Sequence, residues 1–149
     1  MTRRPTPTFR DLDAVEMDDL LGRNHVGRIA YSFQNRVDIE PIHYVYADGA
    51  FYLRTAPGSK LTTLAHTPWV AFEVDEIAGL FDWQSVVAHG SVYVLDDSGS
   101  PDMRASYRVA VRRLRELVPA ALGEGDPVPD RTVVLKLHPA EMTGRAARA

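Results

Sequence analysis

Three apolar-rich segments separated by short polar turns occupy residues 26–55, which read VGRIAYSFQNRVDIEPIHYVYADGAFYLRT. The first segment, Val26–Phe33, alternates between two faces, as a half-buried strand does. Gln34-Asn35 then favours a turn, and Asp48-Gly49 is a strong signal for a two-residue hairpin. Residues 26–55 therefore predict an antiparallel meander of three strands.

The second of these strands, Val37–Ala47, contains a proline at position 41. Proline lacks the N–H that a strand ladder needs, so Pro41 predicts an edge, a bulge or a strand end. Backbone groups freed there would suit the edge of a planar heterocycle, while a twisted edge strand is the simpler interpretation. His43, two residues further on, is either a candidate base or a packing residue.

The rest of the chain predicts further short strands and three helices. Asp13 and Glu16 have the spacing of a capping box, which predicts a helix that ends at Gly22. The other expected elements are a helix over Lys60–His66 capped by Ser59, strands over Trp69–Val74, Trp83–Leu95 (with a bulge at Gly90) and Thr132–Leu137, a loop over Asp75–Asp82, and a long helix that begins at Ser100-Pro101. About six strands, mostly adjacent in sequence, indicate a mainly β (α+β) fold, an antiparallel barrel or sandwich.

Length and composition restrict the class of protein. The chain has 149 residues, which at about 150 residues per domain predicts one domain. We place a flexible N-terminal arm at 1–11, the domain at 12–145 and a C-terminal tail at 146–149. With no cysteine, the chain has no disulfide framework, zinc finger, iron–sulfur site or thiol nucleophile. The five histidines lack metal-ligand spacing, so no metal site is expected.

Charge and hydropathy narrow the expected partners and location. The chain carries 17 Lys+Arg against 20 Asp+Glu, a net charge of -3, which argues against nucleic-acid binding. No apolar run approaches the roughly 20 residues of a membrane-spanning helix, so no membrane association is expected. The basic N-terminus is not followed by the apolar stretch of a secretory signal, and we expect a cytoplasmic protein.

The clearest candidate for chemistry is the run from Arg54 to Lys60, which lies between an expected strand end and an expected helix start. The N–H groups at a helix start favour a phosphate, and Arg54, Ser59 and Lys60 would add charge and hydroxyl donors. The alternative is a capped turn with two solvated cations. Lys60 is one of only two lysines in the chain, and lysine offers a compact charge that arginine does not.

A second candidate is Trp83-Gln84-Ser85, at the start of the expected strand. An indole beside amide and hydroxyl groups suits a site that stacks on a ring. A tryptophan at a strand start also fits an ordinary core or interface position.

In their order and spacing, several motifs together resemble the pyridoxamine 5′-phosphate oxidase-like FMN-binding split-barrel family. Within that family, the closest resemblance is to the nitroimidazole-resistance-like and actinobacterial flavin- or deazaflavin-binding branch. The motifs that carry the resemblance are Val26–Ala30, Glu40–Tyr44, Arg54-Thr55, Gly58–Leu61, Val70–Asp75, Trp83–Val87 with Gly90, and Met142–Arg145.

The resemblance implies a six-stranded antiparallel split β-barrel that forms a homodimer, with the cofactor in a groove between subunits. Arg54, Thr55, Ser59 and Lys60, with Leu61 beside them, would hold the FMN phosphate. Main chain at Ile39, Pro41 and Ile42 would line the flavin ring, with His43 nearby. Trp83, Gln84 and Ser85 would reach the cofactor from the partner subunit.

The implied activity is a flavin-dependent oxidoreductase that acts on a small organic substrate, with no side chain assigned as catalytic. The family's true oxidases carry a basic residue between the loop serine and lysine, whereas Ser59 and Lys60 are adjacent, which argues against pyridoxine-phosphate oxidation. The alternatives are an F420 (deazaflavin)-dependent reductase, a non-catalytic flavin or F420 binder, and a cofactor-free structural barrel.

Overall fold

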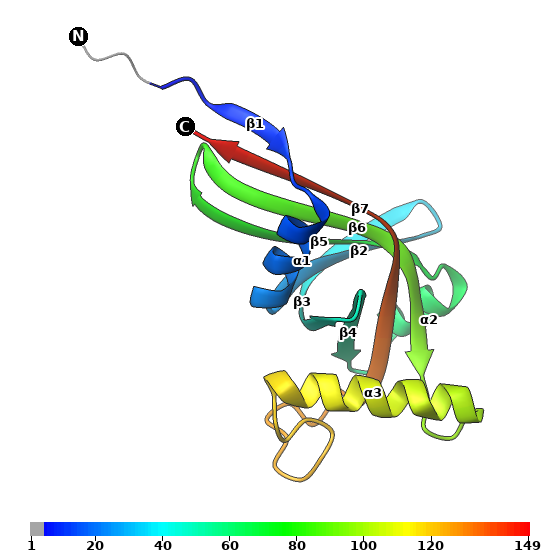
Figure 1. Ribbon diagram of the computed structural model, residues 1–149. Coiled ribbons are helices and arrows are strands. Elements are labelled where there is room, and N and C mark those ends of the chain that lie inside the picture. The colour runs from blue at the N-terminus through cyan, green and yellow to red at the C-terminus, as the bar shows by residue number, and fades with distance from the viewer. Residues whose placement is uncertain (1–4) are drawn as a thin grey trace.

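Six antiparallel strands close into a ring in the computed structural model, which describes residues 5–149 (Figure 1). The sheet order is β1-β7-β4-β3-β2-β5-β6, and β6 also pairs with β7, so β2 to β7 form the ring and β1 lies at its edge. The strands are β1 (Thr8–Asp11), β2 (Val26–Phe33), β3 (Arg36–Ala47), β4 (Ala50–Thr55), β5 (Trp69–Gly79), β6 (Asp82–Leu95) and β7 (Val133–Arg148), and the helices are α1 (Ala14–Arg23), α2 (Ser59–His66) and α3 (Pro101–Leu117). The expected mainly β, six-stranded split barrel is confirmed.

The predicted meander forms β2, β3 and β4, which are neighbours in that order. Both connecting turns have left-handed backbone, at Gln34 (φ 50°) and Asn35 (φ 66°) and at Asp48 (φ 53°) and Gly49 (φ 75°). Asparagine, aspartate and glycine tolerate this conformation best, and its twist matches that of the flanking strands. The two turn predictions are therefore confirmed for a local reason.

The strand β3 changes partner along its length, and this opens the barrel wall. Residues 36–43 pair with β2, whereas Tyr44–Ala47 pair with β4. The β4 residues beyond Leu53 pair only with β7. β3 and β4 consequently part after the Tyr44–Leu53 pair, and the split of the barrel lies between residues 40–43 and residues 54–56.

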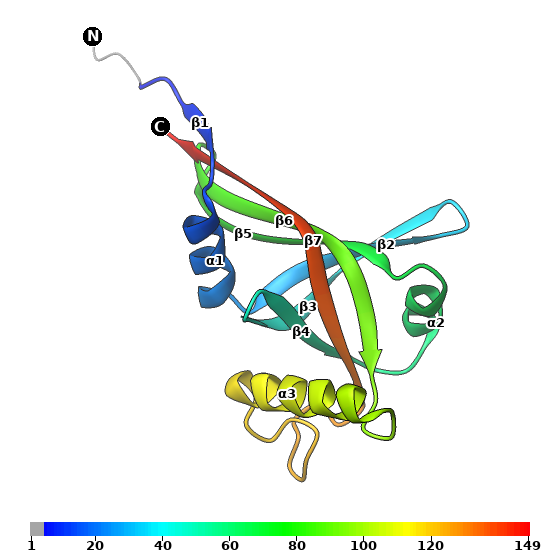
Figure 2. The same ribbon diagram turned by 45° about the vertical axis from the view of Figure 1, so that its right-hand side comes forward.

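Two apolar clusters hold the barrel and its helices together. Inside the barrel, the buried rings of Tyr44, Phe51 and Phe72 lie 4.9–5.7 Å apart, and the Tyr44 hydroxyl donates to the Leu21 carbonyl of α1 at 2.8 Å. The helix α1 begins with the predicted capping box of Asp13 and Glu16. A second cluster packs Ala110 and Leu114 of α3 against Tyr52, Leu95 and Val134, so α3 crosses the lower end of the barrel (Figure 2).

The sheet is longer than the sequence predicts in three places. β5 runs through most of the expected loop 75–82 and leaves only Leu80-Phe81 as a turn. β7 continues past Pro139 to Arg148, so the expected tail at 146–149 is mostly strand. Thr8–Asp11, expected as part of a flexible arm, pairs with the end of β7; residues 1–4 of that arm lie outside the described residues. β1 and β7 gain these hydrogen bonds from distant segments, whereas the end of β5 pairs with β6 across the Leu80-Phe81 turn.

Two smaller predictions concern the bulge at Gly90 and the helix cap at Ser59. The register of β6 against β7 shifts at Gly90, as predicted, and a Cβ there would lie 2.8 Å from the Pro139 Cα. Ser59, however, is the first residue of α2 rather than its cap. Gly58 holds the cap position, so no side chain caps this helix.

None of the helices in the described range combines the length and apolarity needed to cross a membrane.

Candidate functional site

A cavity of about 370 Å³ lies where β3 and β4 part. One wall is residues 40–43 of β3, and the other is residues 54–56 with Lys60 of α2. Because residues 40–43 hydrogen-bond as a strand only to β2, their other edge faces this opening without a neighbouring strand. The expected role of Pro41 as an edge position fits this arrangement.

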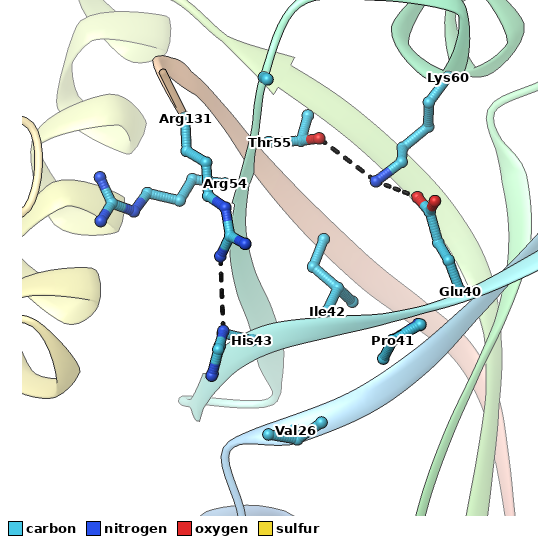
Figure 3. A pocket seen from close by; sticks show the side chains of 10 residues that line it. Val26, Glu40, Pro41, Ile42, His43, Arg54, Thr55, Lys60 and Arg131 are labelled. Carbon is cyan, nitrogen blue, oxygen red and sulfur yellow. Dashed lines mark hydrogen bonds and ion pairs between the residues drawn. The ribbon is translucent and has the colours of Figure 1, made fainter. Parts of the chain in front are cut away.

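Lys60 places its ammonium group in the cavity, against two oxygen-bearing side chains (Figure 3). It forms an ion pair with the Glu40 carboxylate, and its Nζ lies 3.3 Å from the Thr55 Oγ1. The Lys60 side chain is only 18% exposed, and burial lowers its pKa, with a further contribution from the nearby Arg131. Lys60 is thus a desolvated cation whose only carboxylate partner within the described chain is Glu40.

Arg54 lines the same cavity, but its charge is used elsewhere. Its guanidinium points away from Lys60 (Figure 3). It forms two hydrogen bonds to Asp126, of 2.5 and 2.9 Å. Both side chains are buried, at 7% and 4% exposure. The structure therefore places the Arg54 charge in an internal ion pair instead of beside Lys60, where the sequence expectation put it.

Asp126 organises the loop between α3 and β7. Besides Arg54, it accepts hydrogen bonds from the backbone N–H groups of Leu122 and Val128. The Arg54 hydrogen bonds, followed by these backbone N–H groups, hold the pKa of Asp126 well below its usual range. Residues 118–132 are consequently folded back onto the barrel next to the cavity.

Arg131, near the end of that loop, supplies a second cation that sequence reasoning missed. Its Nη1 lies 3.5 Å from the His43 Nδ1 on the far side of the cavity from Glu40 (Figure 3). The surrounding Gly- and Pro-rich sequence carries no motif, and Arg131 is 71 or more residues from Lys60 and His43 in sequence. The Arg54–Asp126 pair and the pairing of Thr55 with Val133 at the start of β7, both long-range contacts, bring it here.

The remaining predicted residues fall into two groups. Thr55, Pro41, Ile42 and His43 line the cavity, while Ser59 is exposed at the start of α2 and Leu61 packs against the main core. Ile39 is 67% exposed on β3. Trp83 and Gln84 line a different cavity with Glu76 and Asp82, and Ser85 follows them on β6, so one chain does not bring these three residues to Lys60.

The split barrel and the cationic cavity in its opened wall together indicate a known class of protein, which a family comparison identifies. The family described as pyridoxamine 5′-phosphate oxidase matches residues 13–146, and the chain belongs to this family. The resemblance seen in the sequence motifs is therefore confirmed. No curated protein is similar enough to this sequence to count as a match.

Solved structures support the same assignment. The chain is similar to an FAD-binding protein from Mesorhizobium loti, with 26% identity and a TM-score of 0.74 over 95% of this chain and 99% of the other. It is also similar to the FAD-binding protein from Mycobacterium smegmatis, with 26% identity and a TM-score of 0.66 over 92% and 99%. The FAD and heme binding protein from Mycobacterium smegmatis is 16% identical, with a TM-score of 0.66 over 92% and 72%, and shares the fold.

Proposed function

We propose that this chain binds a flavin nucleotide in the cavity between β3 and β4 and acts as an oxidoreductase on a small organic substrate. The observation that carries the proposal is the desolvated Lys60 ammonium beside the Thr55 hydroxyl, at the start of α2. Family membership and two FAD-binding relatives that are 26% identical support a flavin as the cofactor. FMN is the form that we expect from the sequence motifs.

The residues in the cavity fit such a group. Lys60 and Thr55 would hold a phosphate, and Ser59, exposed on the first turn of α2, would add a hydroxyl. The unpaired edge of β3 at residues 40–43 offers backbone donors and acceptors to the rim of a ring. When bound, a flavin supplies hydride and electron transfer, and the protein contributes orientation and hydrogen bonds.

Glu40 is the one residue that does not suit a phosphate. Its carboxylate forms an ion pair with the Lys60 ammonium, and its buried Oε1 has no further partner in the part of the chain that the structure describes. An arriving phosphate would compete for Lys60 and repel Glu40. We therefore expect the Glu40 side chain to turn away when the cavity is filled, which leaves Lys60 for the phosphate.

We also propose the homodimer that the family resemblance implies. Within one chain, Trp83 and Gln84 lie in a cavity other than that of Lys60, so a flavin contact from them requires a second subunit. Exposed apolar side chains support a self-association surface: Val37 is 72% exposed and Ile39 is 67% exposed, both on β3.

A second candidate keeps the same cavity with another cofactor or without turnover. F420 also carries a phosphate, and Lys60 would hold it in the same way. A non-catalytic binder would retain the cofactor and consume none of its reduced form. The cationic cavity favours both over a cofactor-free barrel.

The test is to identify the bound molecule and then remove the Lys60 charge. Mass spectrometry and absorbance of the purified protein distinguish FMN, FAD, F420 and haem. Lys60→Ala should weaken FMN binding at least about tenfold, since a charge-assisted contact to phosphate is lost. Lys136→Ala, the only other lysine, whose ammonium lies over the Tyr52 ring, is the matched control and should bind as the natural chain does. Equal FMN affinity in both variants would refute the phosphate site.

A further inference from the structure

A second cavity of about 250 Å³ adjoins the first, and His43, Arg54 and Arg131 line both. Its remaining wall is apolar and comes from the end of α3 and the loop that Asp126 holds: Leu114, Leu117, Val118, Pro127 and Val128. The two cavities therefore lie side by side in one cleft, with a polar half around Lys60 and an apolar half at the end of α3. Nothing in the cofactor site described above uses the apolar half.

The charge at the junction of the two halves is unbalanced. Lys60 is paired with Glu40, and Arg54 is paired with Asp126. Arg131 forms no ion pair among residues 5–149, and its one polar side-chain contact is the His43 ring nitrogen at 3.5 Å. A guanidinium without a carboxylate, beside an apolar pocket, is suited to a ligand that brings its own negative charge.

We propose that the apolar half binds the hydrophobic body of a small organic monoanion, such as an aryl- or alkyl-carboxylate, whose charged group is held by Arg131. A neutral molecule would leave Arg131 without a counter-charge, and a polar polyanion would not fit walls of leucine, valine and proline. Because the two halves share His43, Arg54 and Arg131 as walls, the bound anion would lie next to the proposed cofactor. Only its status as the substrate rests on the proposed function; its binding does not.

Phenylacetate and phenylacetamide are a suitable pair of probes because they share shape and differ in charge. Binding is followed by the methyl resonances of Leu114, Leu117, Val118 and Val128, with the protein as purified and after saturation with FMN. We expect phenylacetate to shift these resonances and to bind at least about tenfold more tightly than phenylacetamide. Equal binding of the two probes, or no shift at these methyl groups, overturns the inference.

Three variants test which charge is responsible for the preference for phenylacetate over phenylacetamide. Arg131→Gln should abolish the preference for phenylacetate, and Arg131→Lys should keep part of it. Arg112→Gln, on the exposed face of α3, is the matched control and should keep all of it. If Arg131→Gln retains the preference, or instead weakens FMN as strongly as Lys60→Ala does, Arg131 does not serve a separate anion and the inference is wrong.

The outcomes separate this inference from the proposed function. Phenylacetate binding with the expected preference in a protein that binds no flavin supports the anion site and refutes the cofactor. Flavin binding that depends on Lys60, without phenylacetate binding, supports the cofactor and refutes the anion site.

Discussion

At the scale of single residues, Glu40 governs how available the Lys60 ammonium is. Glu40→Gln removes the only carboxylate among residues 5–149 that contacts this half-buried cation. We expect the ligand-free variant to melt at a lower temperature, because Lys60 is then desolvated without a counter-charge. Inorganic phosphate and FMN should raise the melting temperature more than they do in the natural chain.

Thermal melts at increasing phosphate concentration check this, with Glu141→Gln as the exposed control. A smaller phosphate effect in Glu40→Gln than in the natural chain would show that Glu40 helps to bind the anion.

A second residue-scale effect concerns Glu73, which lies beside Asp75 and contacts Arg28 at 3.2 Å. Burial, followed by Asp75, raises the pKa of Glu73 from its ordinary value of 4.5 to about 7. The folded state therefore holds a proton that the unfolded state has lost, so this group makes stability fall as the pH rises from 4.5 to about 7. Above that range its contribution is constant.

Glu73→Gln should remove this decline and raise the melting temperature at pH 8. Denaturant unfolding across the pH range measures the slope, with Glu124→Gln in the exposed loop as the control. An unchanged slope in Glu73→Gln would mean that another group titrates there.

At the scale of elements, the loop between α3 and β7 depends on one buried carboxylate. Asp126→Asn removes the charge that pairs with Arg54 while keeping the side chain's shape. We expect the melting temperature to fall by on the order of 10 °C, since a buried arginine loses its partner. The pKa of Asp126 is lowered in the folded state, so the pair stabilises the protein above the ordinary aspartate pKa of 3.8 and loses this effect as the pH falls below it.

Hydrogen exchange should also show the 118–132 backbone opening in Asp126→Asn. Asp130→Asn, exposed on the same loop, should leave both the melting temperature and the exchange unchanged. Comparable losses in the two variants would contradict a specific role for Asp126.

At the scale of the whole molecule, the proposed dimer predicts that two defective chains restore each other. Gln84→Ala should weaken FMN binding severalfold, although Gln84 does not line the Lys60 cavity of its own chain. When Gln84→Ala and Lys60→Ala chains are mixed, unfolded and refolded together, about a quarter of the sites should bind FMN normally, because each mixed dimer of a two-fold assembly has one intact site. Calorimetric titration counts these sites, and each variant refolded alone is the control. No recovery, together with a monomer in sedimentation, would rule out the shared site.

The meander and the starts of α1 and α3 follow from local chemistry, which the sequence displays. Asn35 and Asp48-Gly49 favour the left-handed turn backbone, and Asp13 with Glu16 satisfies the first N–H groups of α1 by contacts three residues apart. Lys60, Thr55 and Pro41 were also visible as candidates, because each lies in a short motif. The order of these motifs was sufficient to indicate the family.

Tertiary structure decided everything that depends on contacts between distant segments. The length of β7 and the pairing of β1 come from long-range hydrogen bonds, so a local pattern ends β7 too early and predicts an arm in place of β1. Arg54 carries the charge that sequence reasoning assigned to a phosphate, yet Asp126, 72 positions away, takes it. The cation that remains at the cleft without a carboxylate partner among residues 5–149 is Arg131, which long-range contacts also bring there. The sequence by itself determined the turns of the meander and the candidacy of Arg54 and Lys60 for an anion. Only the packing of the loop against the barrel decided that Arg54 already has a partner and that Arg131 lies at the cleft, because an arginine's charge is directed by whichever carboxylate the fold brings within reach.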